Sequence, residues 1–272
     1  TGYIWNVSAG GTITAGGTAT SNTVTVTWNT AGPQTVSVNY TDANGCTATA
    51  ATVYNVTVNP LPLPTLAGPG TVCVGITGNT YSTQAGKFNY VWTVSAGGTV
   101  TAGGTATSSS VTVTWTTSGP HTVSVNYEEA SGCDATTPTV YNVTVNPLPV
   151  VGLNGPSAIC ALTPANVYTT EAGMTGYTWN VSAGGMVTAG GTATDNTVTV
   201  TWTTAGPQTV SVNYTNGNGC TATAATVYNV TVHPLPVPAL AGPAPVCATT
   251  TGNVYTTDAG MMGYTWNVSA GG

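Results

Sequence analysis

The run Val111-Thr112-Val113-Thr114-Trp115 alternates strictly between an apolar residue and threonine, and it decides the fold of this chain. A turn follows at Ser118-Gly119-Pro120, and then a second alternating run, Thr122-Val123-Ser124-Val125-Asn126-Tyr127. Successive side chains of a β-strand point to opposite faces, so each run has one apolar and one polar face. Two such runs joined by a Gly-Pro turn predict neighbouring strands with one buried face.

The same runs recur along the chain with a fixed period of 87 residues. Residues 7–62 and 181–236 are identical at 49 of 56 positions. A fixed period of this kind is typical of an array of structural units. The copies are nearly interchangeable, so we expect them to share one role. The tryptophans that mark the period are Trp5, Trp92, Trp179 and Trp266.

Proline-rich segments mark the boundaries between the repeats. Asn59-Pro60-Leu61-Pro62-Leu63-Pro64 recurs as 146–149 and as 233–238. Proline at alternate positions cannot donate to a β-ladder and favours a stiff, extended segment. Cutting after the second proline predicts the back part of a module at 1–62, complete modules at 63–149 and 150–236, and the front part of a further module at 237–272.

The first and last residues of the chain overlap in sequence. Residues 2–11 match residues 263–272 except that Ile4 stands against Thr265. One interpretation is that these 272 residues are cut from a longer array. The other is that the front part of one chain completes the back part of the next, which would join subunits head to tail.

The composition excludes several classes of function. Only 3% of the residues are charged, with a single lysine, no arginine and a net charge of −6. A chain without a basic patch is not expected to bind nucleic acid. No apolar run approaches the roughly 20 residues of a membrane-spanning helix. The abundance of Thr, Val, Gly and Tyr predicts an all-β fold with a neutral, polar surface.

Within 63–149 the alternating runs predict about seven short strands, and these include 72–74, 79–82, 90–94, 111–115, 122–127 and 140–145. Seven strands in fewer than 90 residues, each apolar on one face, predict a sandwich of two sheets. The residues predicted to fill the cores of the modules are Trp5, Trp28, Trp92, Trp115, Trp179 and Trp202.

The order Tyr90-Val91-Trp92, Gly-rich turns, 111–115, 119–127 and a Gly-Cys turn resembles a PKD-like domain of the immunoglobulin-like class. The variant is similar to the one in large secreted surface proteins of Bacteroidota-type gliding bacteria. The resemblance implies a secreted stalk, adhesin or surface filament, exported by a type IX-like route. One departure is that the acidic Gly-Asp-Gly turn of PKD domains is replaced by Ser95-Ala96-Gly97-Gly98, which puts a metal- or charge-dependent role of that turn in doubt.

Six cysteines at fixed spacing in such a chain predict disulfides rather than metal ligands. One pairing lies within modules, Cys73–Cys133 and Cys160–Cys220, and leaves Cys46 and Cys247 to pair outside residues 1–272. The other joins modules, as Cys46–Cys73, Cys133–Cys160 and Cys220–Cys247. In an immunoglobulin-like sandwich the first strand is expected to begin near the turn that joins the last two strands. We therefore favour the pairing within modules, because Cys133 and Cys160 would be separated by about 40 Å of strand.

No set of residues predicts an enzyme or a cofactor site. Catalysis needs a base positioned near a nucleophile, or paired carboxylates. The two histidines, His121 and His233, are replaced by Gln or Asn in the other copies. A catalytic set cannot depend on a residue that a near-identical neighbour lacks, unless only one module is active. The acids Glu128, Glu129 and Asp134 could bind calcium, but a solvated acidic turn fits better because the other copies carry one acid or none.

Two functional hypotheses remain. The first is a structural repeat region of an extracellular filament or surface stalk, which self-associates because its strand edges carry Thr and Ser instead of the charges that guard exposed edges. The second is an adhesin that binds glycans or surfaces through many weak contacts, with avidity from the array. Flat aromatic side chains could stack on sugars, although their alternation along strands indicates a core position first.

Overall fold

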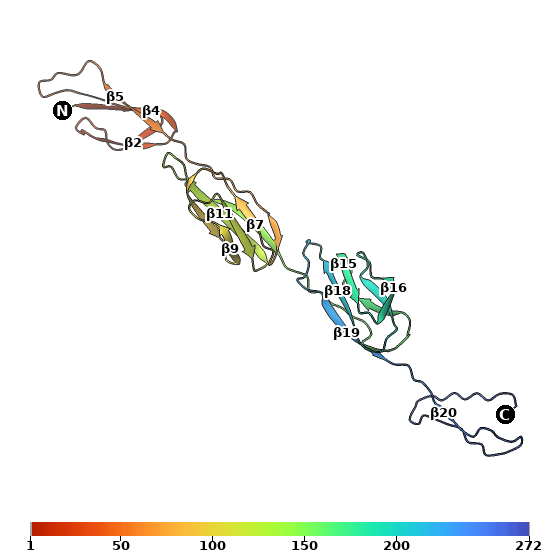
Figure 1. Ribbon diagram of the computed structural model, residues 1–272. Helices are drawn as coiled ribbons and strands as arrows, with labels where there is room; N and C mark the ends of the chain where they lie inside the picture. Colours follow the sequence, from red (N-terminus) through yellow and green to blue (C-terminus); the bar gives the residue numbers. More distant parts are fainter. Residues whose placement is uncertain (1, 272) are drawn as a thin grey trace. The chain divides into compact units, whose positions relative to one another are not determined.

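The computed structural model describes residues 2–271, and these form strands, turns and extended segments without a helix. Contacts between residues divide the chain after Leu148 into two compact units, each of which is described by itself. The all-β prediction is confirmed. Figure 1 shows the strands gathered into separate sandwiches, with β7, β9 and β11 in one and β15, β16, β18 and β19 in another.

The first unit contains a two-sheet sandwich whose strands lie between Thr71 and Asn146, within the predicted module 63–149. One sheet has the order β6-β12-β11-β8 and the other the order β7-β10-β9. Neighbouring strands are antiparallel except that β6 runs parallel to β12. The strands are β6 (Thr71–Cys73), β7 (Asn79–Ser82), β8 (Phe88–Val94), β9 (Gly98–Gly103), β10 (Ser110–Trp115), β11 (Gly119–Glu128) and β12 (Thr139–Asn146).

The core of this sandwich lies where the alternating sequence predicts it. Val111, Val113 and Trp115 of β10 are fully buried, and Val123 and Val125 of β11 are buried from the other sheet. The intervening threonines of β10 lie on the outer face of their sheet. Burying an apolar side chain of this size stabilises the fold by about 1.5–3 kcal/mol, so these strands contribute much of the stability of the module.

Two positions in and beside the Gly-rich turns require glycine, each for a different structural reason. A β-carbon on Gly98 would lie 2.6 Å from the Trp115 ring and 2.5 Å from Val94, so that only glycine lets the indole pack against this strand. Gly103 has a φ of +66°, and a β-carbon there would lie 2.2 Å from the carbonyl oxygen of Ser110. Gly103 is the last residue of its strand, β9, and lies two residues after Thr101, where the register with β10 shifts; its left-handed conformation is one that glycine adopts readily.

The second unit contains an equivalent sandwich whose strands lie between Ala158 and His233, within the predicted module 150–236. Its sheets have the orders β13-β19-β18-β15 and β14-β17-β16. Its core repeats the first, with Tyr168, Val198, Val200 and Trp202 fully buried. The strands are β13 (Ala158–Cys160), β14 (Asn166–Thr169), β15 (Thr175–Val181), β16 (Gly185–Gly190), β17 (Thr197–Trp202), β18 (Gly206–Thr215) and β19 (Thr226–His233).

The two ends of the chain hold partial versions of this fold. Residues 2–62 form the sheets β1-β4-β5 and β2-β3, and residues 237–271 form a single short pair, β20 with β21. The strands are β1 (Tyr3–Val7), β2 (Gly11–Gly16), β3 (Val24–Trp28), β4 (Gly32–Tyr40), β5 (Thr52–Val58), β20 (Leu240–Ala241) and β21 (Thr256–Thr257).

The predicted strands agree with the structure apart from their ends. The predicted turn at Ser118-Gly119-Pro120 is shorter than expected, because β11 already begins at Gly119 and Pro120 lies opposite Thr144 of β12. A proline is tolerated at the first positions of a strand.

The predicted core tryptophans fall into two groups. Trp115 and Trp202 are fully buried. Trp92 and Trp179 are half-buried and pack against the core of their module. Trp5 and Trp28, in the partial module, are half-buried.

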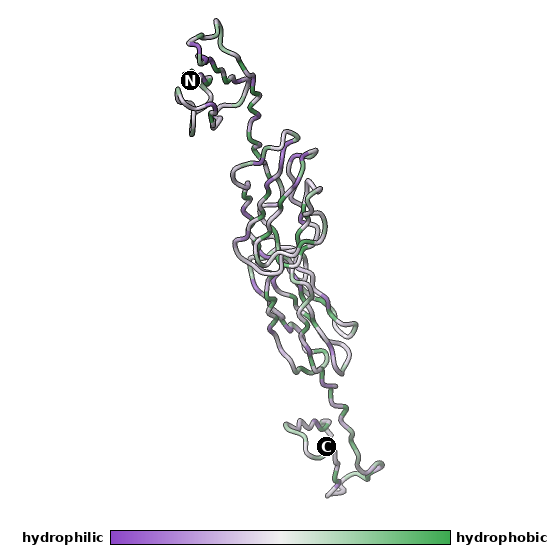
Figure 2. Tube along the Cα trace, turned by 90° about the vertical axis from the view of Figure 1, so that its left-hand side faces the viewer, coloured by the Kyte–Doolittle hydropathy of each residue, from purple (hydrophilic) through white to green (hydrophobic). Residues whose placement is uncertain are grey.

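Hydrophobic and hydrophilic residues are interspersed along the whole chain, as Figure 2 shows. Among the described residues no helix has the length and apolar character needed to cross a membrane.

Candidate functional site

The side-chain contacts that could carry a function lie at the two ends of each module and not in the middle of its sheets. We call the end where the chain comes in from the proline segment the entry end, and the end where the last strand finishes the exit end. In module 63–149 the last strand, β12, runs from the entry end at Thr139 to the exit end at Asn146. Hydrogen bonds from the Thr139 hydroxyl to the Pro64 carbonyl and from the Thr226 hydroxyl to the Val151 carbonyl define the entry end of each module.

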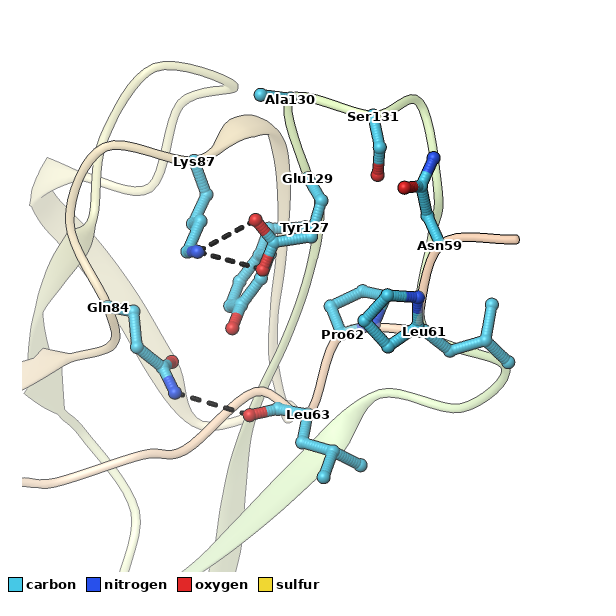
Figure 3. Close-up of a pocket in the computed structure, with 11 residues that line it drawn as sticks. Asn59, Leu61, Pro62, Leu63, Gln84, Lys87, Tyr127, Glu129, Ala130 and Ser131 are labelled. Atoms are coloured by element: carbon cyan, nitrogen blue, oxygen red, sulfur yellow. Dashed lines mark hydrogen bonds and ion pairs between the residues drawn. The ribbon is translucent and has the colours of Figure 1, made fainter. Parts of the chain in front are cut away.

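An open pocket of about 570 Å³ lies at the entry end of module 63–149. It is bounded by the proline segment 60–63 on one side and by the turn 129–131 on the other. Figure 3 shows the ammonium of Lys87 beside the carboxylate of Glu129 and the ring of Tyr127, with Pro62 and Leu61 opposite. The pocket contains the only lysine of the chain.

The Lys87–Glu129 ion pair is well formed but belongs to this module alone. The Lys87 Nζ atom lies 2.8 Å from both carboxylate oxygens of Glu129, and 5.7 Å from the centre of the Tyr127 ring. The hydrogen bond to Glu129 raises the pKa of Lys87. The equivalent positions of the next module hold Met174 and Asn216. The two side chains are only half-buried, so the pair is still screened by salt and stabilises little.

A second contact at the entry end is repeated in the three copies that include its position, and sequence reasoning missed it. Gln84 accepts a hydrogen bond from the Thr65 amide (3.0 Å) and donates one to the Leu63 carbonyl (3.2 Å; Figure 3). The residues at the same repeat position, Glu171 and Asp258, accept hydrogen bonds from the amides of Gly152 (3.0 Å) and Ala239 (2.9 Å). These side chains fasten the residues that follow each proline segment to the sandwich that they enter.

Glu171 has the richest set of partners among these three anchors. Its carboxylate also accepts hydrogen bonds from Thr170 Oγ1 (2.7 Å) and Tyr214 Oη (2.9 Å). Burial opposes ionisation of the carboxylate, but these hydrogen bonds and that of Gly152 outweigh it, so that the pKa of Glu171 is lowered. Burial together with the contact to this carboxylate raises the pKa of Tyr214 to about 12. The only signal in the sequence was the recurrence of a side-chain oxygen at one repeat position.

At the centre of the predicted acidic turn is a residue whose side chain holds the turn together in two of its three copies. Asp42 and Asn216, which are equivalent to Glu129, each use Oδ1 to accept two backbone amide hydrogens of their own turn. Glu129 is one methylene longer and pairs with Lys87 instead. Glu128 lies opposite Asp134 in an isolated bridge, and its carboxylate accepts a hydrogen bond from the Asn89 amide. The carboxylates of Glu129 and Glu128 thus have different partners, Lys87 and Asn89.

His121 replaces a glutamine in a structural position. Its ring lies 4.8 Å from the Trp115 ring, between centres, and Nδ1 lies 3.3 Å from Ser95 Oγ. In the next module Gln208 meets the equivalent Ser182 at 2.6 Å. The histidine therefore occupies a structural position that a neutral amide fills in the other copies.

Aromatic side chains are mostly internal in the two complete modules. Phe88 is exposed there, and its equivalent in the next module is Thr175. Tyr90 and Tyr127 pack edge to face, as do Tyr177 and Tyr214. The remaining aromatics that are exposed among the described residues lie in the partial modules, and they are Tyr40, Tyr54, Tyr255, Tyr264 and Trp266.

The cysteines of one module lie at its opposite ends, which contradicts the predicted pairing within modules. Cys73 is in register with Asn146 at the exit end, whereas Cys133 accepts a hydrogen bond from the Glu129 amide in the turn at the entry end. The intervening strand β12 has 8 residues, or about 23 Å, and a disulfide needs Cα atoms within about 7 Å. The expectation was wrong because the first strand of this module pairs parallel to the last one and finishes, rather than begins, at the cysteine.

The oxidation states agree with this geometry. Cys73 and Cys220 are disulfide-bonded, whereas Cys133 and Cys160, their expected partners, are free. Cys46 and Cys247 are also free, and both are exposed.

Comparisons with known proteins identify the repeats. The sequence model of a family described as PKD-like domain matches residues 59–143 and 146–230, which together make up more than half of the chain. No curated protein sequence matches the chain significantly.

Several solved structures of surface proteins resemble the fold at low identity. The D00-D0 domain of intimin has 15% identity and a TM-score of 0.35, over 63% of this chain and 100% of that one. Invasin, a bacterial integrin-binding protein, has 16% identity and a TM-score of 0.31, over 88% of this chain and 54% of that one. FdeC, an Escherichia coli adhesin, has 18% identity and a TM-score of 0.36, over 86% of this chain and 85% of that one.

Proposed function

Because the chain belongs to the family of PKD-like domains, we propose that it is a structural, non-catalytic repeat region of an extracellular filament or surface stalk. The observation that carries this proposal is what the two complete modules share. The core and the entry-end anchor recur in both modules, whereas the chemically distinctive side chains do not. Lys87, Glu129 and His121 become Met174, Asn216 and Gln208.

A stalk must keep successive modules at a defined distance, and the entry end supports that role. The proline segments favour an extended backbone without a ladder partner. Directly after them, Gln84, Glu171 and Asp258 each hold a backbone amide of the entering chain. The chain therefore leaves a stiff segment and is fixed to a sandwich within a few residues, which leaves little free length at the entrance to a module.

The surface supports an extracellular, self-associating role. Charged groups make up 3% of the residues, so the edge strands carry few of the charges that prevent edge-to-edge pairing. The edge strand β9 bears Thr99 and Thr101 beside Val100, which is 47% exposed. The export route and the bacterial source implied by the resemblance remain predictions.

Electron cryo-microscopy of the native, unreduced material tests the proposal. We expect regular fibres or rods whose axial repeat matches one module or a small number of modules. A glycan array probed with the full chain, with a heat-unfolded sample as the control, tests the adhesin alternative. Strong glycan binding together with isolated, flexible particles would overturn the structural role and favour an adhesin whose modules act through avidity.

A further inference from the structure

We propose that the open pocket at the entry end of module 63–149 binds a neutral pyranose residue of a glycan. The volume of the pocket, about 570 Å³, lies within the range of about 300–1,000 Å³ that is usual for small-molecule sites. The inference goes beyond the proposed structural role and does not rest on it, because one weak site in one module leaves the repeat and its core unchanged.

The first observation is a tyrosine hydroxyl that is available to a ligand. Tyr127 lines the pocket and is only 2% exposed. Figure 3 shows its hydroxyl pointing toward Gln84 and Leu63, but within the described part of the chain this hydroxyl has no hydrogen-bond partner. Polar groups of nearly buried side chains are normally paired. The hydroxyl of Tyr127 is therefore a group that a ligand in the pocket can satisfy.

The anchor position explains why this hydroxyl is available. In the next module the carboxylate of Glu171 binds both the amide of Gly152 (3.0 Å) and the hydroxyl of Tyr214 (2.9 Å), the counterpart of Tyr127. In module 63–149 the anchor is Gln84, whose side-chain oxygen and nitrogen are each engaged with the backbone of the entering chain. The exchange of a carboxylate for an amide at this repeat position thus leaves the tyrosine hydroxyl to the pocket.

The second observation is an ion pair whose charges compensate each other inside the pocket. Of the described residues that line it, Lys87 and Glu129 are the charged ones, and two contacts of 2.8 Å join them. An ammonium has three donors and a carboxylate about four acceptor sites, so both groups keep capacity for a ligand. A sugar hydroxyl both donates and accepts, and it can bind beside both groups at once. An anion would face the carboxylate and a cation the ammonium, so the pair favours a neutral ligand.

The third observation is an apolar wall opposite the polar groups. The wall is formed by the proline segment 60–63, and Figure 3 shows Pro62 across the pocket from the ion pair. Leu61 and Leu63 line the pocket as well and are 54% and 83% exposed. A pyranose has hydroxyls around its edge and C–H groups on its faces, so that its faces can cover apolar surface of this kind. Alternate prolines also stiffen the wall before a ligand binds.

The polar groups of this pocket belong to one module. At the repeat positions of Lys87, Glu129 and Gln84 the next module has Met174, Asn216 and Glu171. All three differences border one pocket. A half-exposed ion pair contributes little to stability, so binding is the property that these residues can provide.

The single lysine of the chain gives a selective probe of the pocket. The full chain is labelled with ¹⁵N-lysine, so that its amide spectrum contains one signal, that of Lys87. This signal is followed while the methyl pyranosides of glucose, galactose, mannose and N-acetylglucosamine are added in turn. We expect a saturable shift with at least one of them and a Kd on the order of 1–10 mM. No shift with any of the four glycosides would overturn the proposal.

Variants at the pocket test which groups bind the sugar. Tyr127→Phe should weaken binding of the responsive glycoside about 3- to 10-fold, as expected for the loss of one hydrogen bond. Tyr214→Phe is the matched control and should leave the affinity unchanged, because it removes the equivalent hydroxyl from the other module. Equal affinities in the unmodified protein and Tyr127→Phe, or equal losses in the two variants, would contradict the proposal.

A change of specificity provides a readout that a purely structural role would not give. Glu129→Asn introduces the residue of the next module and leaves the charge of Lys87 uncompensated. We expect the affinity for the neutral glycoside to fall at least about tenfold and binding of the anionic methyl glucuronide to appear. Unchanged preference for the neutral glycoside would show that the ion pair does not select the ligand, against the proposal.

A second variant keeps the test decisive if Glu129→Asn fails to fold. Lys87→Met also carries the residue of the next module, and saturation-transfer NMR detects glycoside binding without the lysine label. We expect the transfer to the glycoside that is seen with the unmodified protein to be lost in this variant. Retention of the full transfer would place the sugar outside this pocket and refute the inference.

Discussion

The sequence Val-Thr-Val-Thr-Trp occurs at 24–28, 111–115 and 198–202, and the first two of these copies differ in burial. In β10 the residues Val111, Val113 and Trp115 are fully buried. In β3 the equivalent residues Val24, Val26 and Trp28 are only half-buried. Identical sequence thus gives a closed core in one region and a partly open one in the other.

The difference comes from the strands that precede the first tryptophan of a module. In the complete module β7 places Tyr81 over the core, where its hydroxyl accepts a hydrogen bond from Trp115 Nε1 (3.1 Å). Tyr81 also packs on Tyr141 of β12, with ring centres 5.9 Å apart. The described residues before Trp5 hold no strand equivalent to β7, and Tyr54, the counterpart of Tyr141, is 74% exposed. The front part of a module therefore closes its core.

The largest expected effect is the loss of a buried indole. Trp115→Ala should destabilise module 63–149 by about 3–5 kcal/mol, because it opens a cavity in a closed core. Trp28→Ala should cost much less, since Trp28 is already half-buried. Hydrogen exchange of the full chain, read by mass spectrometry for each region, measures both. Equal losses of protection in the two regions would show that the core around Trp28 is closed in solution.

The next prediction concerns Gly98, which packs against the ring of Trp115. Gly98→Ala should destabilise its module by about 1–3 kcal/mol through overpacking, because the new β-carbon meets the Trp115 ring at 2.6 Å. Gly11→Ala meets Trp28 at the same distance, but this indole is free to shift toward solvent. Denaturant melts followed by tryptophan fluorescence, with hydrogen exchange to assign the region, should show the smaller change for Gly11→Ala.

An effect of the same order is expected for the tyrosine hydroxyl at the core. Tyr81→Phe leaves the buried Trp115 N–H without its acceptor, which costs about 1–3 kcal/mol. Tyr54→Phe is the control. Because the Tyr54 side chain is exposed, loss of its hydroxyl should leave the stability unchanged. Thermal unfolding of both variants measures the difference. Equal stability of the Tyr81→Phe variant and the unmodified protein would mean that water reaches the indole.

The smallest expected effect is a difference between the two complete modules in how their stability depends on pH. The pKa of Glu171 is lowered in the folded protein, so its stabilising contribution is present above the unfolded pKa and is lost as the pH falls through the folded one. Tyr214 has its pKa raised to about 12, so its contribution is present below the unfolded pKa near 10 and is lost as the pH rises toward 12. Module 63–149 carries the neutral Gln84 at the anchor position.

Hydrogen exchange between pH 3 and 6, corrected for the intrinsic rate, measures this difference. We expect module 150–236 to lose more protection on acidification than module 63–149. Glu171→Gln should remove the extra acid dependence at a cost of about 1 kcal/mol or less at neutral pH. An unchanged acid dependence in that variant would assign the effect to another carboxylate.

The sequence by itself determined the repeat, the strands and the inward faces of those strands. Strict alternation is a local pattern with a period of two residues, and a period of two fixes which side chains share a face. Val111, Val113 and Trp115 could therefore be assigned to a core without knowledge of their neighbours. The repeat period likewise identified His121 and the acidic cluster around Glu129 as features of single modules.

Only the tertiary structure decided where the cysteines lie and which side chains hold the chain at the entry end. The spacing of Cys73 and Cys133 is the same whether the first strand begins or finishes at the cysteine, and the parallel pairing of β6 with β12 placed them at opposite ends. Gln84 and Glu171 recur at one repeat position but belong to no alternating strand pattern, and nothing in the sequence marks their partners, which are backbone amides 19 residues earlier in the chain. The physical reason is that a strand pattern specifies a face, whereas strand direction, register and burial depend on residues far away in the sequence.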